Sequence, residues 1–285
     1  MKRSLTGLKI LLVVYSVLFS IWGCGEKSSE DLYKKAMALY EAGKYAKAVK
    51  VFELLLAQYP EHSLARKVRY QLGEIYFYKL NQPPIALKYL QELYAQSPQG
   101  KYSMNALQLI GAIDESLNKY ADAIEVYRKL LREYAAEIEA AKYQLAIAEG
   151  YFKFNNYQQA IAEYETLIKQ YPNSPYVARA NFQIANSYAL TEAYDKAIEH
   201  YEALLQAGSV SEQLAADIKL ELAYCYGQKE QFPKALDLYE GLLKVNAKDV
   251  SLDKELILKK REQILKRLEE SAREPGEVQW KREKR

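Results

Sequence analysis

One spacing recurs through most of the chain: an aromatic residue, two further residues, and then an alanine followed by an aliphatic residue. The alanines lie at positions 48, 86, 123, 160, 197 and 235, so successive copies are 38, 37, 37, 37 and 38 residues apart. A fixed period of this length indicates repeated units, each of which buries its apolar face only by stacking on its neighbours. This period restricts the chain to a repeat architecture with six copies of one unit.

Within a copy, small and aromatic residues recur at helical spacing. The fourth copy carries Ala148, Tyr151, Tyr157, Ala160, Tyr164, Leu167 and Pro172. The matching small residue of the first helix in the other copies is Ala36, Gly73, Gly111, Ala185 or Ala223. Small residues let two helices cross at close range, and aromatic residues fill the space between successive helix pairs. The pattern predicts two helices per copy, here named helix A and helix B.

This series resembles the tetratricopeptide repeat (TPR) motif. The resemblance implies an all-α fold, a TPR α-solenoid in which antiparallel helix pairs form a right-handed superhelix. Six TPR units of 37–38 residues are expected over residues 31–248. The usual period is about 34 residues. We expect the excess to add nearly one turn to the start of helix A, with Ser174 as an N-cap and Pro175 in the first turn. We expect Pro83-Pro84 to account for one more residue in the second unit.

Residues 249–273 read as a C-terminal capping helix, because an open solenoid end must be covered. Its apolar stripe is expected to comprise Leu252, Leu256, Ile264, Leu265 and Leu268. A partner-binding helix is the alternative. Residues 274–285 are expected to form a charged, disordered tail.

The N-terminus begins with a basic segment containing Lys2, Arg3 and Lys9, followed by an apolar run from position 10 to 21. This order is typical of a secretory signal peptide, here residues 1–23. A membrane-spanning helix needs about 20 apolar residues, so an uncleaved anchor is the weaker interpretation.

The sequence Ile21-Trp22-Gly23-Cys24 resembles the bacterial lipobox, although Trp22 departs from the usual residue. The resemblance implies that the chain is cleaved before Cys24, so that this cysteine becomes the N-terminal residue and carries acyl chains such as palmitate. Residues 24–30 then form a short tether. Gly25, in place of an aspartate, favours the outer membrane with the protein on its periplasmic side. A plain secreted chain or an uncleaved chain is the alternative.

The distribution of charge argues against nucleic-acid binding. The net charge of +3 is equal to the contribution of Lys2, Arg3 and Lys9, so the rest of the chain is neutral overall. A neutral body lacks the basic excess expected of a nucleic-acid-binding protein. Cys225 has no partner once Cys24 is lipidated, and we expect it to be a buried small hydrophobic residue.

Residues for catalysis or metal binding do not cluster in the sequence. The two histidines, His62 and His200, are isolated, and no glycine-rich loop or paired nucleophile and base is present. We therefore expect no enzyme, no metal, no cofactor and no small-molecule substrate.

The TPR resemblance implies a concave surface lined by helix A at fixed positions in each unit. Projecting those positions predicts a groove for other proteins or peptide segments formed by Tyr33, Tyr40, Tyr70, Glu74, Phe77, Glu149, Phe152, Lys153, Arg179, Phe182, Asn186 and Tyr224, together with Met37 and Leu145. Arg179, Asn186, Lys153 and Glu149 are the stronger candidates for contacts. The aromatic members have an alternative role in packing between helices.

Long units ending in Tyr-Pro, as in Gln58-Tyr59-Pro60 and at Tyr171-Pro172, on a precursor with a lipobox resemble the BamD family of outer-membrane lipoproteins. That resemblance implies a scaffold in outer-membrane protein assembly. The units are also similar to those of CpoB-type TPR proteins. The alternative function is therefore an adaptor for cell-envelope or peptidoglycan machinery, or for a secretion apparatus.

Overall fold

The structure is a computed structural model that describes residues 28–208, 210–245 and 250–273. The predicted signal peptide, Cys24 and the predicted tail at 274–285 lie outside the described residues. The described parts are all-helical, as predicted. None of the described helices is long and apolar enough to cross a membrane.

The chain divides into two compact units, and unit 1 comprises Met1–Tyr134. The described part of its first helix runs over residues 28–41. The following elements are α2 (Tyr45–Gln58), α3 (Ala65–Glu74) with the π-helical turn η1 (Ile75–Lys79), α4 (Pro83–Gln96), α5 (Lys101–Ser116) and α6 (Tyr120–Tyr134). These elements are the A and B helices of three repeats.

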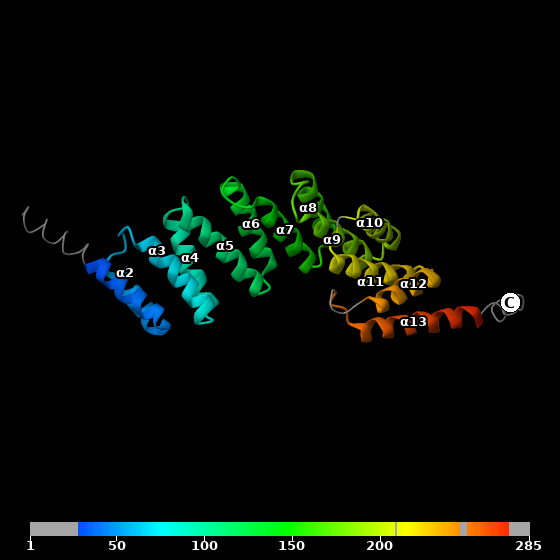
Figure 1. Cartoon of the computed structure of the whole chain (residues 1–285). Helices are drawn as coiled ribbons and strands as arrows, with labels where there is room; N and C mark the ends of the chain where they lie inside the picture. Colours follow the sequence, from blue (N-terminus) through cyan, green and yellow to red (C-terminus); the bar gives the residue numbers. More distant parts are fainter. Residues whose placement is uncertain (1–27, 209, 246–249, 274–285) are drawn as a thin grey trace, which may run out of the picture. The chain divides into compact units, whose positions relative to one another are not determined.

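Unit 2 comprises Ala135–Arg285 and holds the other three repeats. Its helices are α7 (Ala140–Lys153), α8 (Tyr157–Gln170), α9 (Val177–Leu190), α10 (Tyr194–Ala207), α11 (Glu212–Gln228), α12 (Phe232–Lys244) and α13 (Lys254–Arg273). In each unit, consecutive helices pack against one another as antiparallel pairs (Figure 1). This pairing confirms the predicted fold class.

The core of each repeat joins a small residue on helix A to a large residue on helix B. The large residues lie four positions after the repeating alanine and are all buried: Phe52, Leu90, Tyr127, Tyr164, Tyr201 and Tyr239. A Cβ atom at Gly111 would lie 2.3 Å from Cε1 of Tyr127, and one at Gly73 would lie 2.6 Å from the Leu90 side chain. Helix A therefore needs glycine or alanine at this position because the side chain of helix B fills the space in front of it.

The turn between helix A and helix B has the same backbone conformation in every repeat. One residue per turn has a positive φ, between 51° and 71°: Gly43, Asn81, Asn118, Asn155, Glu192 and Glu230. Glycine and asparagine adopt this left-handed conformation readily, whereas other residues are strained in it. The last two repeats therefore place a strained glutamate in the turn.

Replacing Glu230 by asparagine is expected to raise the free energy of unfolding by about 0.5–1 kcal/mol, because asparagine relieves the strain. Chemical denaturation measures the change. The matched control is Glu199→Asn, at an exposed position inside α10, where the lower helix propensity of asparagine should reduce stability. A loss of stability in Glu230→Asn would contradict the expectation.

The second repeat has one residue more than the others, and the prediction that Pro83-Pro84 accounts for it is wrong. The small residue of helix A precedes the left-handed turn residue by eight positions in this repeat, from Gly73 to Asn81, and by seven in each of the others. The insertion is absorbed by η1, because a π-helical turn is the form that a helix takes around one inserted residue. Pro83 and Pro84 instead begin α4, where proline is well tolerated.

The predicted lengthening of helix A occurs in α5 and α11, which have 16 and 17 residues. It is wrong for α7 and α9, which have 14 residues each. Before α9, the Ser174 hydroxyl accepts a hydrogen bond from the backbone N–H of Tyr176 at 3.3 Å, and its carbonyl accepts one from Val177 at 3.2 Å. This turn holds the added residues outside the helix, so Ser174 is not its N-cap and Pro175 is not in its first turn.

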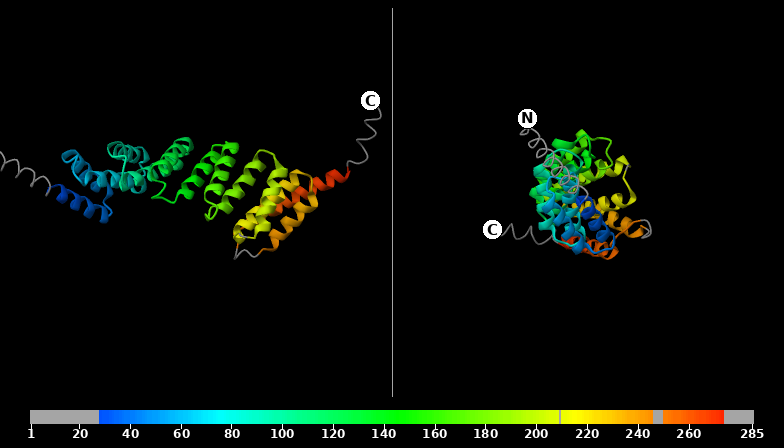
Figure 2. Two further views of the ribbon diagram at one scale, coloured as in Figure 1. Left: turned by 90° about the horizontal axis from the view of Figure 1, so that it is seen from above. Right: turned by 90° about the vertical axis from the view of Figure 1, so that its left-hand side faces the viewer.

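Helix α13 packs beside α12 and contacts α11, as expected of a cap (Figure 2). Ile257 and Ile264 are buried, whereas Leu256 is 41% exposed. The predicted stripe is therefore wrong at Leu256, because the helix turns Ile257 toward the core. Cys225 is fully buried as predicted, and burial raises the pKa of its thiol to about 12.

Candidate functional site

The helix A face of unit 2 carries an ion pair between two successive repeats. Nε of Arg179 on α9 lies 2.7 Å from Oε1 of Glu149 on α7. The Arg179 side chain is 59% exposed and that of Glu149 is 27% exposed. An ion pair this accessible to water contributes little to stability. Because the Arg179 side chain is largely exposed, its guanidinium group is accessible for further contacts on the helix A face.

A pocket of about 330 Å³ opens on the same face of unit 2. Three helices A contribute to it: α7 through Phe152, α9 through Asn186, Ala189 and Leu190, and α11 through Glu221 and Tyr224. Its lining is completed by Glu192 in the turn after α9 and by Tyr194 and Tyr201 on α10. The pocket therefore brings together side chains from three successive repeats, and we call it the helix A pocket.

Hydrogen bonds fix the amide of Asn186 at the wall of the helix A pocket. The Tyr201 hydroxyl donates to Oδ1 of Asn186 at 2.5 Å, and Nδ2 of Asn186 donates to Oε1 of Gln183 at 2.6 Å. The ring of Phe182 packs against that of Tyr201, with centroids 6.0 Å apart. Burial raises the pKa of Tyr201, so its phenol stays protonated and remains a donor.

Glu221 places a half-buried carboxylate at the helix A pocket. Burial raises the pKa of this carboxyl group, Lys260 of α13 opposes that effect, and Asp217 adds to it. The same carboxylate raises the pKa of Tyr239 on α12, after the larger effect of burial. Desolvation penalises the charged form of a carboxyl group, so this position is costly for a negative charge.

Two tyrosines form an aromatic corner of the pocket. The rings of Tyr194 and Tyr224 meet edge to face, with centroids 6.3 Å apart, and burial and a hydrogen bond with Tyr224 raise the pKa of Tyr194. Nζ of Lys260 lies 5.2 Å from the centroid of the Tyr224 ring. Tyr224 therefore already accepts a cation from its own chain.

The structure brings some of the predicted groove residues together in unit 2 and separates others. Phe152, Asn186 and Tyr224 line the helix A pocket, and Glu149 pairs with Arg179. Phe182 packs behind Tyr201 without lining the pocket. Leu145 is buried in the core. Lys153 is exposed at the end of α7.

In unit 1, the predicted groove residues are engaged mainly with other side chains. Tyr33 packs on Phe52 with centroids 5.8 Å apart, and Nζ of Lys67 lies 4.7 Å from its centroid. Tyr40 meets Tyr45 edge to face at 5.4 Å. These contacts match the alternative, in which the aromatic residues pack between helices.

The other predicted residues of unit 1 lie on α3 and η1. The ring centroids of Tyr70 and Tyr102 are 6.2 Å apart, and those of Phe77 and Tyr78 are 4.8 Å apart. Burial raises the pKa of Glu74, and a hydrogen bond with Tyr70 opposes that shift. A cavity of about 90 Å³ is lined by Met37, Tyr40, Phe52, Gln71, Glu74 and Ile75, so it includes three of the predicted residues, Met37, Tyr40 and Glu74.

Sequence reasoning missed Glu221, Tyr194 and Tyr201 as pocket residues. Tyr194 and Tyr201 belong to helix B, which the projection from helix A leaves out. Glu221 lies two positions before Ala223, a position not used in the projection. The sequence does indicate Glu221 in another way, because it is the one charged residue in the otherwise apolar run from Leu220 to Tyr226.

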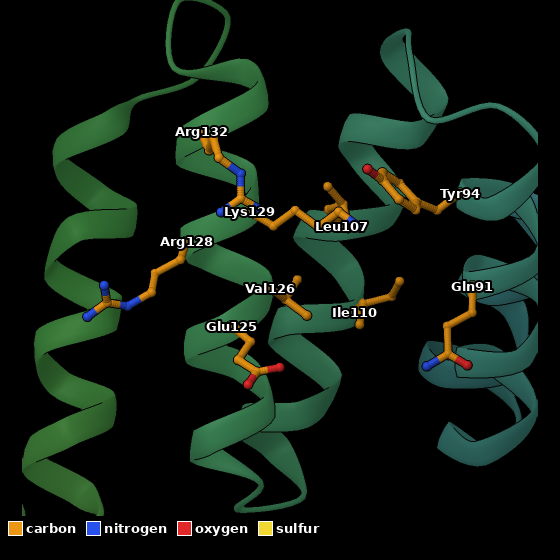
Figure 3. A pocket seen from close by; sticks show the side chains of 9 residues that line it. All are labelled: Gln91, Tyr94, Leu107, Ile110, Glu125, Val126, Arg128, Lys129 and Arg132. Carbon is orange, nitrogen blue, oxygen red and sulfur yellow. The ribbon is translucent and has the colours of Figure 1, made fainter.

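A second concavity, of about 500 Å³, lies in unit 1 between α4, α5 and α6. Its floor includes Leu107 and Ile110, and Lys129 extends from α6 toward Tyr94 (Figure 3). Nζ of Lys129 lies 3.9 Å from the Tyr94 ring centroid, and the Tyr94 hydroxyl donates to Oε2 of Glu133 at 2.5 Å. The lysine is thus already engaged, and an acidic side chain lies beside it.

Among the residues that the structure describes, no group of three or more His, Cys, Asp and Glu side chains is placed to hold a metal ion. The residues described above offer hydrogen-bonding, aromatic and charged groups for contacts with another chain.

Comparisons with solved structures find several similar structures at low sequence identity. The structure titled YrrB, "a TPR protein with an unusual peptide-binding site", has a TM-score of 0.50 and 17% identity, covering 74% of this chain and 97% of that chain. The TPR-like repeats of a putative kinesin light chain from Podosopora anserina have a TM-score of 0.50 and 17% identity, covering 66% and 98%. A MamA structure has a TM-score of 0.49 and 16% identity, covering 62% and 90%.

No curated protein matches the sequence. The profile of the family described as Tetratricopeptide repeat matches residues 33–101, 114–175, 145–212 and 194–250, which together make up more than half of the chain. Proteins of this family are scaffolds that bind other proteins or peptides. With its repeat spacing, its paired helices and this match, the chain belongs to the tetratricopeptide repeat family.

Proposed function

We propose that this protein is a lipid-anchored scaffold on the periplasmic side of the outer membrane, where it holds segments of other proteins during outer-membrane protein assembly. The binding site in this proposal is the helix A face of unit 2. The bound segment lies across α7, α9 and α11.

The observation that carries the binding proposal is the helix A pocket, which draws its lining from three successive repeats. A segment that crosses these helices contacts a wall from each repeat. The pocket also has an exposed apolar side chain: Leu190 is 54% exposed and lines the pocket together with the aromatic residues. A concave site lined by apolar and aromatic residues with a few polar groups is typical of a binding site.

The ion pair of Arg179 and Glu149 adds a charged group to the same face. Because Arg179 is 59% exposed, its guanidinium group retains donors for a backbone carbonyl or a carboxylate of the bound segment. In an extended segment, such polar contacts fix the register while the aromatic pocket supplies contact area.

The cellular setting in this proposal rests on the N-terminal sequence. The lipobox-like Ile21-Trp22-Gly23-Cys24 supports lipidation, and Gly25 supports the outer membrane. Several acyl chains, at about 0.8 kcal/mol per buried methylene, would hold the protein firmly on the bilayer. Residues 25–30 span at most about 20 Å, so the first repeat would lie close to the membrane.

Site-specific crosslinking in intact cells tests the binding face. A photoreactive residue in place of Leu190 or Arg179 is expected to capture the same partner protein. The matched control is the exposed Glu165 on helix B α8 of the same unit, from which capture of that partner is not expected. Capture from position 165 alone would refute the helix A face as the binding site.

Co-purification and fractionation test the cellular role. The full-length protein is expected to recover a β-barrel insertase, and Cys24→Ser is expected to lose acyl labelling and to leave the outer-membrane fraction. Recovery of cell-wall enzymes without an insertase would reject outer-membrane assembly in favour of a peptidoglycan adaptor. Unchanged acylation and fractionation of Cys24→Ser would reject the lipid anchor.

A further inference from the structure

We infer that the helix A pocket receives a basic side chain, lysine or arginine, from the bound segment, and that Glu221 is its counter-charge. This inference rests on the proposed function, because it names the chemistry of the segment that the helix A face holds.

The walls of the pocket suit a cation. Phe152, Tyr194 and Tyr224 are partly exposed and line it, whereas Tyr201, which also borders the pocket, is fully buried. The face of an aromatic ring attracts an ammonium or guanidinium group, and cages of several rings are used to recognise such cations. Lys260, at 5.2 Å from the Tyr224 ring centroid, shows that an ammonium group of this chain already adopts such a contact here.

The charge of the lining has one sign. Among the residues that the structure describes, Glu192 and Glu221 line the pocket, and no lysine or arginine does. Lys260 compensates Glu221 only in part, because the pKa of this carboxyl group remains raised by burial despite the lysine. A second cation would therefore be favourable, since it would offset the cost of keeping this carboxylate in a desolvated position.

The shape of lysine and arginine also matches the pocket. Both residues have an apolar stem and a charged tip, and they bury the stem along apolar surface. Ala189 and Leu190 provide apolar surface in the lining, and Asn186 adds a polar residue to it. A short apolar side chain would leave Glu221 uncompensated, and an acidic one would meet like charge.

The test uses two synthetic peptides that are identical except for one central residue, lysine or its uncharged analogue norleucine, and a third with glutamate there. Affinity is measured for the folded protein, and NMR shifts of the Tyr194 and Tyr224 rings report where each peptide binds. We expect the lysine peptide to bind roughly tenfold more tightly than the norleucine peptide, on the scale of a desolvated cation–π and ion-pair contact.

Two variants should change this preference in opposite directions. Glu221→Gln keeps the side-chain volume and is expected to abolish the preference for the lysine peptide over the norleucine peptide. Lys260→Met is expected to strengthen lysine binding, because it removes the competing cation. The control is Glu165→Gln, an exposed carboxylate on α8, which should leave the preference unchanged. Circular dichroism verifies that each variant is folded, and Lys260→Met tests the inference independently should Glu221→Gln fail to fold.

The possible outcomes separate the two proposals. Equal binding of the lysine and norleucine peptides with shifts at the pocket tyrosines overturns the inference and leaves the proposed binding face intact. Preference for glutamate, or an unchanged preference in Glu221→Gln, also overturns it. Binding of neither peptide overturns the inference, and if crosslinks from positions 179 and 190 also fail, the proposed function falls with it.

Discussion

Replacing Tyr201 with alanine is expected to lower the free energy of unfolding of unit 2 by about 3–5 kcal/mol, because a fully buried aromatic ring is lost and a cavity remains. The ring is 0% exposed and packs against Phe182 with centroids 6.0 Å apart. Tyr201 occupies the repeat position that the core of helix B uses in every repeat. Urea denaturation followed by circular dichroism measures the loss, and a change below about 1 kcal/mol would show that the repeat core does not depend on this ring.

The matched variant Tyr201→Phe separates the ring from its hydroxyl. Phenylalanine keeps the packing but removes the donor to Oδ1 of Asn186, so we expect a loss of only about 0.5–1.5 kcal/mol. Because this hydrogen bond fixes the Asn186 amide, Tyr201→Phe should change the NMR signals of that amide. An unchanged environment at Asn186 would show that Gln183 alone positions it.

Replacing Gly111 with alanine is expected to lower the free energy of unfolding of unit 1 by about 1–3 kcal/mol, although alanine has the higher helix propensity. The added Cβ atom would lie 2.3 Å from Cε1 and 2.7 Å from Cζ of Tyr127, whose ring is itself buried. The rigid ring cannot move aside without displacing its neighbours, so α5 and α6 must separate. Thermal and urea denaturation measure the effect.

Two other glycines serve as controls for Gly111→Ala. Gly241 on α12 is exposed and has no atom within 4 Å of an added Cβ, so Gly241→Ala is expected to gain about 0.5–1 kcal/mol. Gly227 faces the flexible end of Ile264 at 2.6 Å, so Gly227→Ala should fall between the two. If Gly111→Ala were as stable as the wild-type protein, close approach would not be what selects glycine at this position.

Most of the fold is predictable from the sequence because every repeat buries residues at the same spacing. Tyr127, Tyr164 and Tyr201 recur at the spacing that places them in the core, and the structure buries all three. Local spacing was less reliable for placing inserted residues. The insertion predicted at Pro83-Pro84 is absorbed by the π-helical turn η1, because proline is compatible with the first positions of α4.

The candidate site was predictable only in part. Projecting fixed positions of helix A identified Phe152, Asn186 and Tyr224, which the structure does bring to one pocket. It also included Tyr33 and Tyr40, which pack against other aromatic rings, the alternative role expected for aromatic residues at these positions. A sequence pattern gives the face of a helix, whereas the neighbouring side chains determine whether a residue on that face packs or lines an opening.

By itself, the sequence determined the repeat class, the helix pairing and the buried repeating positions of helix B, because these depend on spacing along one chain. The N-terminal features that suggest a lipid anchor also belong to the sequence alone. Only the tertiary structure decided that Glu221, Tyr194 and Lys260 meet around Tyr224. These residues come from α11, α10 and α13, and their proximity depends on how three helices pack, which no local period encodes.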